Sequence, residues 1–444
     1  MIPEYVRRAL DALNNAGHEA YLVGGCVRDT LLGKTPFDYD ITTSALPEET
    51  KAALVNYKVA ETGIEHGTVT AVIDGRPIEI TTYRADGEYT DHRRPDKVNF
   101  TRSLSLDLCR RDFTVNAMAW DGKTVIDLFG GCEDLKNKII RAVGDAEVRF
   151  EEDALRILRA LRFASKLGFG IERETERAIL KKYHLLSYVS AERIYSELCG
   201  ILMGDNVFDV LMRYKDVICC IIPELSSAVG CDQMTPYHIY DVYEHTARVV
   251  GASEKNKVLR LAALLHDVAK PSCKTVDKNG RGHFKGHAPA GAETAQKILK
   301  RLRAENATVN EVCSLIKYHD ERPLARRRDV LRYMAKCSQC DFELLLSLRH
   351  ADNSAKNPDY RGDGDDLDAF ETVYRDLISE GAPYKVNQLD ISGEDISALG
   401  ARGKEIGETL RHLLACVADG MAENEKTSLM AAAKAYITLK NRGN

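Results

Sequence analysis

The feature that most constrains this chain is a short run near residue 20, where an apolar segment leads into two glycines and a helix start. Residues 20–23 favour a buried strand, Gly24 and Gly25 follow, and residues 26–32 resume helical spacing. Glycines let backbone N–H groups approach a phosphate closely, and a helix N-terminus adds partial positive charge. Arg28 lies on the first turn, where it can pair with the same phosphates. The run predicts a phosphate-binding turn, although many tight turns carry two glycines for steric reasons alone.

A pair of aspartates follows this turn. Residues 37–42 alternate between apolar and polar side chains, as a half-buried strand would, so Asp38 and Asp40 should point to the same side. Mg²⁺ prefers oxygen ligands and keeps positions open for substrate phosphates. Together with the glycine turn, the pair predicts a Mg²⁺ site that a bound triphosphate completes. Glu79, on an expected strand at 77–83, is a candidate third carboxylate, but an exposed strand glutamate explains it equally well.

The pattern of apolar residues predicts an α+β chain with one mixed sheet. Residues 1–16 have helical spacing at Val6, Ala9, Leu10 and Leu13. Strands are expected at 59–60, 68–73 and 77–83, the last two joined by the tight turn Asp74-Gly75-Arg76, and from about residue 146 the pattern is almost entirely helical. We therefore expect a small mixed-sheet head at 1–145, followed by an all-helical neck at 146–225, body at 226–360 and tail at 361–444.

The composition of the chain says more about the cellular compartment of the protein than about its activity. No apolar run is long enough to cross a bilayer, and the N-terminus lacks the apolar core of a secretory signal. Twelve cysteines without a repeating spacing favour reduced thiols in the cytoplasm, and the lone pair Cys337 and Cys340 is weak evidence for metal or redox work. We expect a cytoplasmic protein that does not enter membranes.

The net charge of −5 does not by itself favour a nucleic-acid partner. Binding to phosphates depends on where basic residues lie rather than on their sum. Basic residues gather in three stretches, each of which is also compatible with a solvated face: Arg93, Arg94, Lys97, Arg102, Arg110 and Arg111; Lys297, Lys300, Arg301 and Arg303; and Arg322, Arg326, Arg327, Arg328 and Arg332.

Five segments in order resemble the motifs of a known family, the bacterial CCA-adding tRNA nucleotidyltransferases and their poly(A) polymerase relatives. The first joins the glycine turn to the aspartate pair. The family resemblance is specific over roughly the first 170 residues and looser beyond. The segments are Leu22-Val-Gly-Gly-Cys-Val-Arg-Asp29 with Asp38-Tyr-Asp40; Glu61-Thr-Gly-Ile-Glu-His-Gly-Thr68; Thr82-Tyr-Arg-Ala-Asp-Gly-Glu-Tyr-Thr-Asp-His-Arg-Arg-Pro95; Arg110-Arg-Asp-Phe-Thr-Val-Asn-Ala117; and Glu152-Asp-Ala-Leu-Arg-Ile-Leu-Arg-Ala-Leu-Arg-Phe163.

The resemblance implies a template-independent polymerase that acts on tRNA with CTP and ATP. The terminal ribose hydroxyl of tRNA would attack the α-phosphorus of the nucleotide, with release of pyrophosphate. Asp38 and Asp40 would be catalytic and would hold two Mg²⁺ ions. Gly25, Arg28 and Arg111 would bind the nucleotide phosphates and sugar. The head would then be a nucleotidyltransferase domain, and the neck and tail would bind RNA.

Asp153 and Arg156 are candidates for reading the base without a template. Three residues apart on an expected helix, they would share a face and offer an acceptor beside a planar donor fork. Such a pair matches the Watson–Crick edges of cytosine and adenine, whereas uracil and guanine would leave the carboxylate unpaired. By spacing alone, an ordinary surface ion pair between the two residues is the better interpretation. The family resemblance favours the base-reading role instead. Arg159 and Arg162 rotate progressively away from Asp153, so we assign them to nucleotide phosphate, RNA or structural contacts.

Full CCA addition is the leading prediction among the family's activities. The charged stretch from Arg84 to Asn99 resembles the flexible segment of full CCA-adding enzymes, which enzymes that add only A tend to lack or alter. Extra basic motifs typical of poly(A) polymerases are not found downstream. An A-adding enzyme or a poly(A) polymerase remains the alternative within the family.

The body has a second set of polar residues in ordered positions. His266 and Asp267 interrupt an apolar helix at 261–270, and His245 and Asp352 lie on other helical segments. Buried polar pairs need partners, which a metal ion supplies, and these ligands suit Mn²⁺, Fe²⁺, Co²⁺ or Ni²⁺.

This pattern resembles the HD phosphohydrolase superfamily, which implies an HD-type body. His287 and His319 lie where some of its members hold a second metal or a substrate phosphate. Two further function classes compete with the polymerase: a metal-dependent HD phosphohydrolase whose head only binds nucleotide, and a non-enzymatic RNA-binding protein. The intact aspartate pair argues against the first, and both sets of carboxylates argue against the second.

Overall fold

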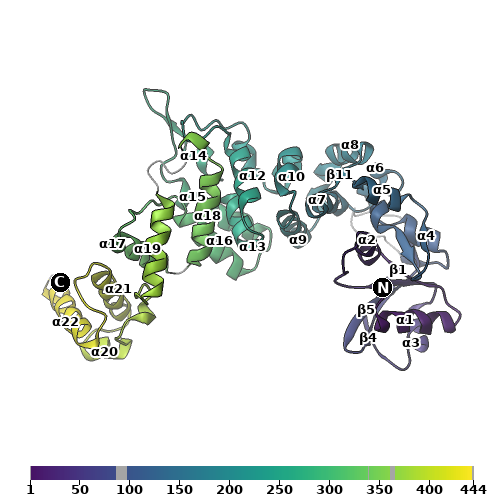
Figure 1. Cartoon of the computed structure of the whole chain (residues 1–444), viewed down its shortest axis with the longest axis horizontal. Helices are drawn as coiled ribbons and strands as arrows, with labels where there is room; N and C mark the ends of the chain where they lie inside the picture. Colours follow the sequence, from purple (N-terminus) through teal and green to yellow (C-terminus); the bar gives the residue numbers. More distant parts are fainter. Residues whose placement is uncertain (1, 87–97, 339, 361–365, 443–444) are drawn as a thin grey trace. The chain divides into compact units, whose positions relative to one another are not determined.

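The computed structural model of the chain describes residues 2–86, 98–338, 340–360 and 366–442. The chain divides into two compact units, residues 1–223 and 224–444, coloured from purple to teal and from teal to yellow in Figure 1. The predicted domain boundaries after residue 145, between head and neck, and after residue 360, between body and tail, stay predictions. Residues 87–97, the central part of the stretch from Arg84 to Asn99, lie outside the described residues.

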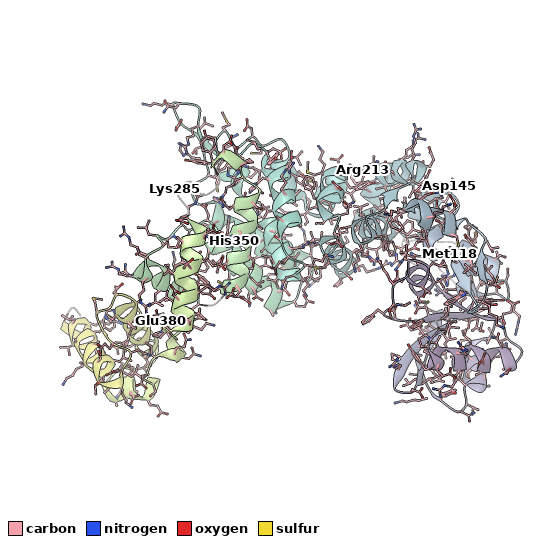
Figure 2. The ribbon with its side chains drawn as sticks, in the orientation of Figure 1. Met118, Asp145, Arg213, Lys285, His350 and Glu380 are labelled. Atoms are coloured by element: carbon pink, nitrogen blue, oxygen red, sulfur yellow. The ribbon has the colours of Figure 1, made fainter. Side chains whose placement is uncertain are left out.

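A seven-stranded mixed sheet organises unit 1, which confirms the expected head. The strand order is β3-β4-β5-β2-β1-β8-β9, in which β2 and β5 are parallel and the other neighbours are antiparallel. Met118, labelled in Figure 2, begins β8. The strands are β1 (Ala20–Val23), β2 (Asp40–Thr43), β3 (Lys58–Gly63), β4 (Thr68–Ile73), β5 (Arg76–Thr82), β8 (Met118–Trp120) and β9 (Val125–Asp127).

Helices cover this sheet and continue into the neck. The first helix buries Val6, Ala9, Leu10 and Leu13, the four residues whose spacing predicted it. Asp145, labelled in Figure 2, caps α6 by accepting hydrogen bonds from the N–H groups of the next turn. The helices of unit 1 are α1 (Glu4–Asn15), α2 (Gly25–Leu31), α3 (Pro47–Ala53), α4 (Leu104–Cys109), α5 (Gly131–Asn137), α6 (Ala146–Glu152), α7 (Leu155–Leu167), α8 (Arg173–Lys182), α9 (Ala191–Leu202), α10 (Val207–Arg213) and α11 (Lys215–Ile221).

Two local predictions for unit 1 are wrong in detail. The expected strand at 37–42 begins only at Asp40, so Asp38 precedes β2 instead of belonging to it. The expected continuous helix through Asp153 is interrupted, because α6 ends before this residue and α7 starts two residues later. Asp153 has extended backbone angles (φ −139°, ψ 100°), and its side chain accepts a hydrogen bond from the N–H of Leu155. This local bond competes with helix continuation.

Unit 2 is a helical body and tail. In Figure 1, α12, α13, α15, α16 and α18 lie together, and α13 packs against α12, α16 and α18. A separate apolar cluster joins α20, α21 and α22. The helices are α12 (Val242–Ala252), α13 (Lys257–Leu265), α14 (Lys270–Cys273), α15 (His287–Arg301), α16 (Asn306–Tyr318), α17 (Arg327–Lys336), α18 (Phe342–Ser354), α19 (Leu367–Ser379), α20 (Gly393–Ala398), α21 (Lys404–Ala418) and α22 (Lys426–Arg442).

Short strand pairs accompany the main elements. They are β6 (Arg84–Asp86) with β7 (Val98–Phe100), β10 (Ile139–Ile140) with β11 (Gly170–Ile171), and β12 (Thr275–Val276) with β13 (Gly282–His283). Strands β11, β12 and β13 are small departures from the all-helical pattern expected after residue 145. Within the described part of the chain, no helix combines the length and apolar character that a membrane span requires.

Candidate active site and metal centre

Three carboxylates meet at the start of β2. Asp40 opens this strand, and Glu79 is its register partner on the parallel strand β5. Tyr39 is buried and packs edge-on against Tyr5, with ring centroids 6.2 Å apart, whereas Asp38 is exposed. The structure therefore brings the aspartate pair together and adds Glu79, which sequence alone left undecided.

The negative charges of these three carboxylates repel one another. Burial and, to a smaller extent, the charges of Asp38 and Glu79 raise the pKa of Asp40 to about 6, and Arg111 acts in the opposite direction. A carboxyl group whose ionisation is opposed in this way gains from a nearby cation. A cation bound between these carboxylates would relieve their mutual repulsion.

The glycine turn leaves space between the carboxylates and two arginines. Gly24 has a φ of +74°, and a Cβ there would lie 3.5 Å from Arg111 Nη1 and 3.9 Å from Asp40 Oδ2. A Cβ on Gly25 would lie 3.5 Å from Arg28 Nη2. The predicted site residues Gly25, Arg28, Asp40 and Arg111 thus surround one turn.

Asp107 supports this turn and was missed by sequence reasoning. Its buried carboxylate accepts hydrogen bonds from Arg110 Nη2 (2.8 Å), Arg111 Nη2 (3.3 Å) and Thr42 Oγ1 on β2 (3.0 Å). Burial alone would raise the pKa of Asp107, but Arg111 and Arg110 lower it. The spacing of Asp107 on α4 from Arg110 and Arg111, which follow directly after this helix, was the available signal. Arg111 Nε is buried and has no hydrogen-bond partner among the described residues.

A chain of hydrogen bonds joins the turn to the neck. Arg28 donates from Nη1 to Asn116 Oδ1 (2.7 Å) and from Nε to Asp29 Oδ1 (2.8 Å). Asn116 Nδ2 donates to Asp112 Oδ1 (3.2 Å), and Asp112 Oδ2 accepts from Arg159 Nε (2.8 Å). Arg159 is therefore connected to Arg28 through two side chains, and α7 is fixed relative to α2.

The ring of Phe163 is shared by three guanidinium groups. Their central carbons lie 5.2 Å (Arg28), 5.6 Å (Arg159) and 4.4 Å (Arg162) from the ring centroid. Arg162 also donates from Nε to Glu197 Oε2 on α9 at 2.6 Å. These contacts concentrate positive charge on one side of the glycine turn.

Lys166 adds to this positive surface and was not singled out by sequence. Burial and the charges of Arg162 and Arg28 lower the pKa of Lys166, although Glu197 acts in the opposite direction. Helices α7 and α9 approach closely here, since a Cβ on Gly200 would lie only 2.3 Å from Arg162 Cδ.

Asp153 and Arg156 are not paired with each other in this structure. Asp153 Oδ2 accepts from Arg193 Nη2 on α9 (2.8 Å). Arg156 donates to Glu152 Oε2 (2.6 Å) and to the carbonyl oxygen of Arg110 (3.0 Å). The expectation that the pair shares one helical face fails because the helix is interrupted at Asp153, and the base-reading role remains a prediction.

Unit 2 contains the second predicted cluster. The four predicted ligands converge: His245 Nε2 lies 2.9 Å from Asp352 Oδ1 and 3.6 Å from Asp267 Oδ2, and His266 Nε2 lies 3.1 Å from Asp267 Oδ2. Two more histidines approach the other oxygen of Asp267. They are His287, with Nε2 at 3.4 Å, and His319, with Nε2 at 3.8 Å.

Backbone carbonyls fix the orientation of three of these histidines. The carbonyl oxygens of Ala263, Phe284 and Ile316 lie 2.8, 2.8 and 2.6 Å from the Nδ1 atoms of His266, His287 and His319 respectively. Because a carbonyl can only accept, Nδ1 carries the proton and Nε2 keeps its lone pair directed at the cluster. Protein metal sites use this arrangement to orient imidazole ligands.

Asp267 lies between two groups of possible ligand atoms. His245, His266 and Asp267 offer atoms within 4.8 Å of one another, as do Asp267, His287 and His319. All five residues are buried, and His266 Nε2, His287 Nε2 and both oxygens of Asp267 have no hydrogen-bond partner within the described residues. Orphaned buried donors and acceptors are costly, so this arrangement fits one or two metal ions.

Two lysines compensate the carboxylates of this centre. Lys270 Nζ lies 2.7 Å from Asp267 Oδ2, outside hydrogen-bonding direction, and donates to Gln233 Oε1 at 2.9 Å. Lys356 Nζ lies 2.8 Å from Asp352 Oδ2. Burial alone would raise the pKa values of both aspartates, but nearby histidines and these lysines lower them well below the usual range.

Family models match three parts of the chain. Residues 20–141 match the poly A polymerase head domain, residues 168–228 match the probable RNA and SrmB-binding site of polymerase A, and residues 236–353 match the HD domain. The chain is therefore similar to the poly A polymerase head domain over residues 20–141 and to the HD domain over residues 236–353.

Individual relatives narrow the resemblance to CCA-adding enzymes. The chain is 51% identical over 219 residues to the CCA-adding enzyme of Ligilactobacillus salivarius, a match that covers 48% of this chain and 54% of the relative. It is 47% identical over 239 residues to that of Pediococcus pentosaceus, with 53% and 59% covered. The chain thus matches little more than half the length of these curated relatives.

Solved structures extend the likeness over the whole chain. The Bacillus stearothermophilus CCA-adding enzyme in complex with CTP matches with a TM-score of 0.71 and 29% identity, covering 100% of both chains. The Thermotoga maritima CCA-adding enzyme complexed with tRNA matches in fold, with a TM-score of 0.60, 21% identity and 98% and 96% covered. The resemblance indicated by the sequence motifs is confirmed.

The raised pKa of Asp40 predicts how pH affects stability without metal. Between the ordinary value of 3.8 and about 6, the folded chain holds a proton on Asp40 that the unfolded chain has lost. Folding stability is therefore lost as pH rises through this window. Asp40→Asn should stabilise the metal-free protein above pH 6, by at most about 3 kcal/mol, and the gain should shrink toward pH 4. Thermal unfolding in chelator measures it.

Asp11→Asn provides the control, because Asp11 is an exposed aspartate on α1. Its unfolding temperature should follow that of the unaltered chain at every pH. A destabilised Asp40→Asn protein at pH 7.5 would contradict the repulsion between the carboxylates.

Proposed function

We propose that the chain adds CCA to the 3′ end of tRNA, using CTP and ATP and releasing pyrophosphate. The observation that carries this proposal is the meeting of Asp38, Asp40 and Glu79 beside the glycine turn and Arg111. Asp38 and Asp40 would hold two Mg²⁺ ions, with Glu79 adjacent. The ions supply activation of the attacking hydroxyl and neutralisation of the leaving pyrophosphate.

The surrounding residues would bind and orient the nucleotide. Gly25 leaves its backbone open to a phosphate, and Arg28 and Arg111 lie on either side of the turn. The buried, unpartnered Nε of Arg111 is available to a ligand oxygen. Arg159 and Arg162 would supply positive charge around Phe163 toward the triphosphate or the RNA.

Asp153 and Arg156 would read the base after exchanging their present partners. Arg156 would leave Glu152, and Asp153 would turn an oxygen lone pair toward the exocyclic amine of cytosine or adenine. Arg193, which donates a hydrogen bond to Asp153, would keep that carboxylate oriented.

The relatives support the substrates. A CTP complex is named for the Bacillus stearothermophilus enzyme and a tRNA complex for the Thermotoga maritima enzyme. The neck segment that matches an RNA-binding model supports tRNA as the partner, with further contacts expected from the tail. All twelve cysteines, which lie within the described residues, are free thiols, and this supports a cytoplasmic setting.

Extension of tRNA transcripts tests the proposal. Transcripts ending at the position before CCA, at C and at CC should each grow to a complete CCA end with labelled CTP and ATP. An enzyme that adds only A would extend the CC transcript alone, and a poly(A) polymerase would make long tails. Asp40→Ala should lower extension by about a thousandfold or more, since it removes a ligand of the catalytic ions. Asp11→Asn should extend normally.

A second function is favoured by the orphaned atoms of unit 2. We infer that the HD centre binds transition metal ions, of the series Mn²⁺, Fe²⁺, Co²⁺ and Ni²⁺, and hydrolyses phosphate esters. His245, His266, Asp267 and Asp352 would hold the first ion. His287 and His319 would hold a second, with Asp267 shared between the two because each of its oxygens faces one histidine pair.

Metal titration of variants distinguishes a shared carboxylate from two separate sites. In an Asp40→Ala background, which disables the head, Asp267→Asn should lose both Mn²⁺ ions, whereas His319→Ala should lose one. His184→Ala, an exposed histidine in unit 1, should lose neither. Retention of full Mn²⁺ binding by Asp267→Asn would contradict the assignment. Cleavage of p-nitrophenyl phosphate and of 2′,3′-cyclic AMP would then show whether the loaded centre acts as a phosphatase or a cyclic phosphodiesterase.

A further inference from the structure

Two lysines of unit 2 are buried beside the carboxylates of the HD centre. The side chains of Lys270 and Lys356 are 8% and 10% exposed, and each ammonium lies within 2.8 Å of a carboxylate oxygen. Lysine is rarely buried unless it is paired. Their partners, Asp267 and Asp352, are the same carboxylates that the proposed metal ions would use.

If metal ions entered the centre while both lysines stayed protonated, the centre would carry a large positive charge. Among the buried groups of the centre, two carboxylates and two ammonium groups sum to zero, and the histidine ligands are neutral when they offer a lone pair to a metal. Asp320, whose Oδ2 lies 3.8 Å from His287 Nδ1, is 47% exposed and is left out of this sum because water screens it. One divalent ion would leave the centre with a charge of +2 and two would leave +4. Buried charge without compensation is strongly unfavourable, so the ions must enter together with an anion.

A further histidine, His238, lies beside His245 on this part of the centre. The ring of His238 is 4.9 Å from that of His245, and His238 Nδ1 is buried without a hydrogen-bond partner in the described structure. Its neighbour Tyr237 accepts a hydrogen bond through its carbonyl from the N–H of Asn357 (2.9 Å), which places the segment of Lys356 against the segment of His238. Lys270 reaches the same side through Gln233, whose amide donates to the carbonyl of Tyr240 (3.3 Å).

Solvent reaches the centre on this side. The side chain of Asp352 is 17% exposed, compared with 1% for Asp267, and Lys356 pairs with the more exposed carboxylate. An anion that enters beside Asp352 meets Lys356 first.

We propose that Lys356 and Lys270 are exchangeable counter-ions of the HD centre. They neutralise Asp352 and Asp267 while metal is absent. When divalent ions take the carboxylates, the released ammonium groups, with His238, bind the phosphate group of the substrate. This inference rests on the proposed metal binding of the HD centre and adds the residues that recognise the phosphate.

Calorimetric titration with Mn²⁺, with and without inorganic phosphate, tests the exchange in the full chain carrying Asp40→Ala. Phosphate should raise the affinity for Mn²⁺ by about tenfold, because binding of the two is thermodynamically coupled. In K356M, Mn²⁺ alone should bind severalfold more tightly, since its competitor for Asp352 is gone, and the effect of phosphate should fall to about twofold or less. A purely structural lysine would instead weaken Mn²⁺ binding when removed.

Matched variants make the result specific. Lys297→Met removes the same charge from an exposed position on α15 and should keep both the affinity and the coupling. Lys356→Arg should restore the coupling, and Lys356→Gln repeats the test if the methionine variant unfolds. Normal coupling in K356M or K356Q, or weaker Mn²⁺ binding, would overturn the exchange while leaving metal binding intact. Failure of the parent protein to bind Mn²⁺ through His266 would overturn the proposed HD function as well.

Discussion

Repulsion among carboxylates is the interaction on which the site in unit 1 depends. The fold places Asp40 at the first residue of a strand, beside Glu79 on its parallel neighbour and close to Asp38 in the chain. Tyr39, which separates the two aspartates in the chain, is buried. Arg111 offsets part of the charge but is itself held by Asp107. A divalent cation with a triphosphate would resolve this imbalance, and under the proposed function the same arrangement would position a nucleophile and a leaving group.

The carboxylates of the two sites differ in how far neighbouring cationic side chains neutralise them. In unit 1, arginines pair with other acidic residues, as Arg159 does with Asp112 and Arg162 with Glu197, so Asp38, Asp40 and Glu79 are only partly compensated. In the HD centre, each aspartate already has a lysine beside it. Under the two proposals, the head would bind divalent ions directly, whereas the HD centre would have to exchange its lysine ammonium groups for them. The difference follows from which side chains the helices bring to each carboxylate.

Sequence patterns predicted the parts of the site that are local in the chain. The strand at 20–23, the glycine turn and the aspartates at 38 and 40 are linked by short-range spacing, and the structure brings them together. Glu79 could not be assigned, because its position depends on the parallel pairing of β2 with β5, which spacing does not encode. The break at Asp153 was missed because apolar periodicity continues across it, while a side-chain bond to Leu155 ends the helix. His287 and His319 needed the packing of α15 and α16 to reach Asp267.

The most direct measurement is a crystal structure of the chain soaked with Mn²⁺ and CTP, with the ions located by their anomalous scattering. The account predicts anomalous peaks bridging the carboxylates of Asp38 and Asp40, with the triphosphate extending past Arg111 along the glycine turn. Bound CTP with no ion at these carboxylates, or Mn²⁺ held there while the triphosphate lies elsewhere, would contradict it.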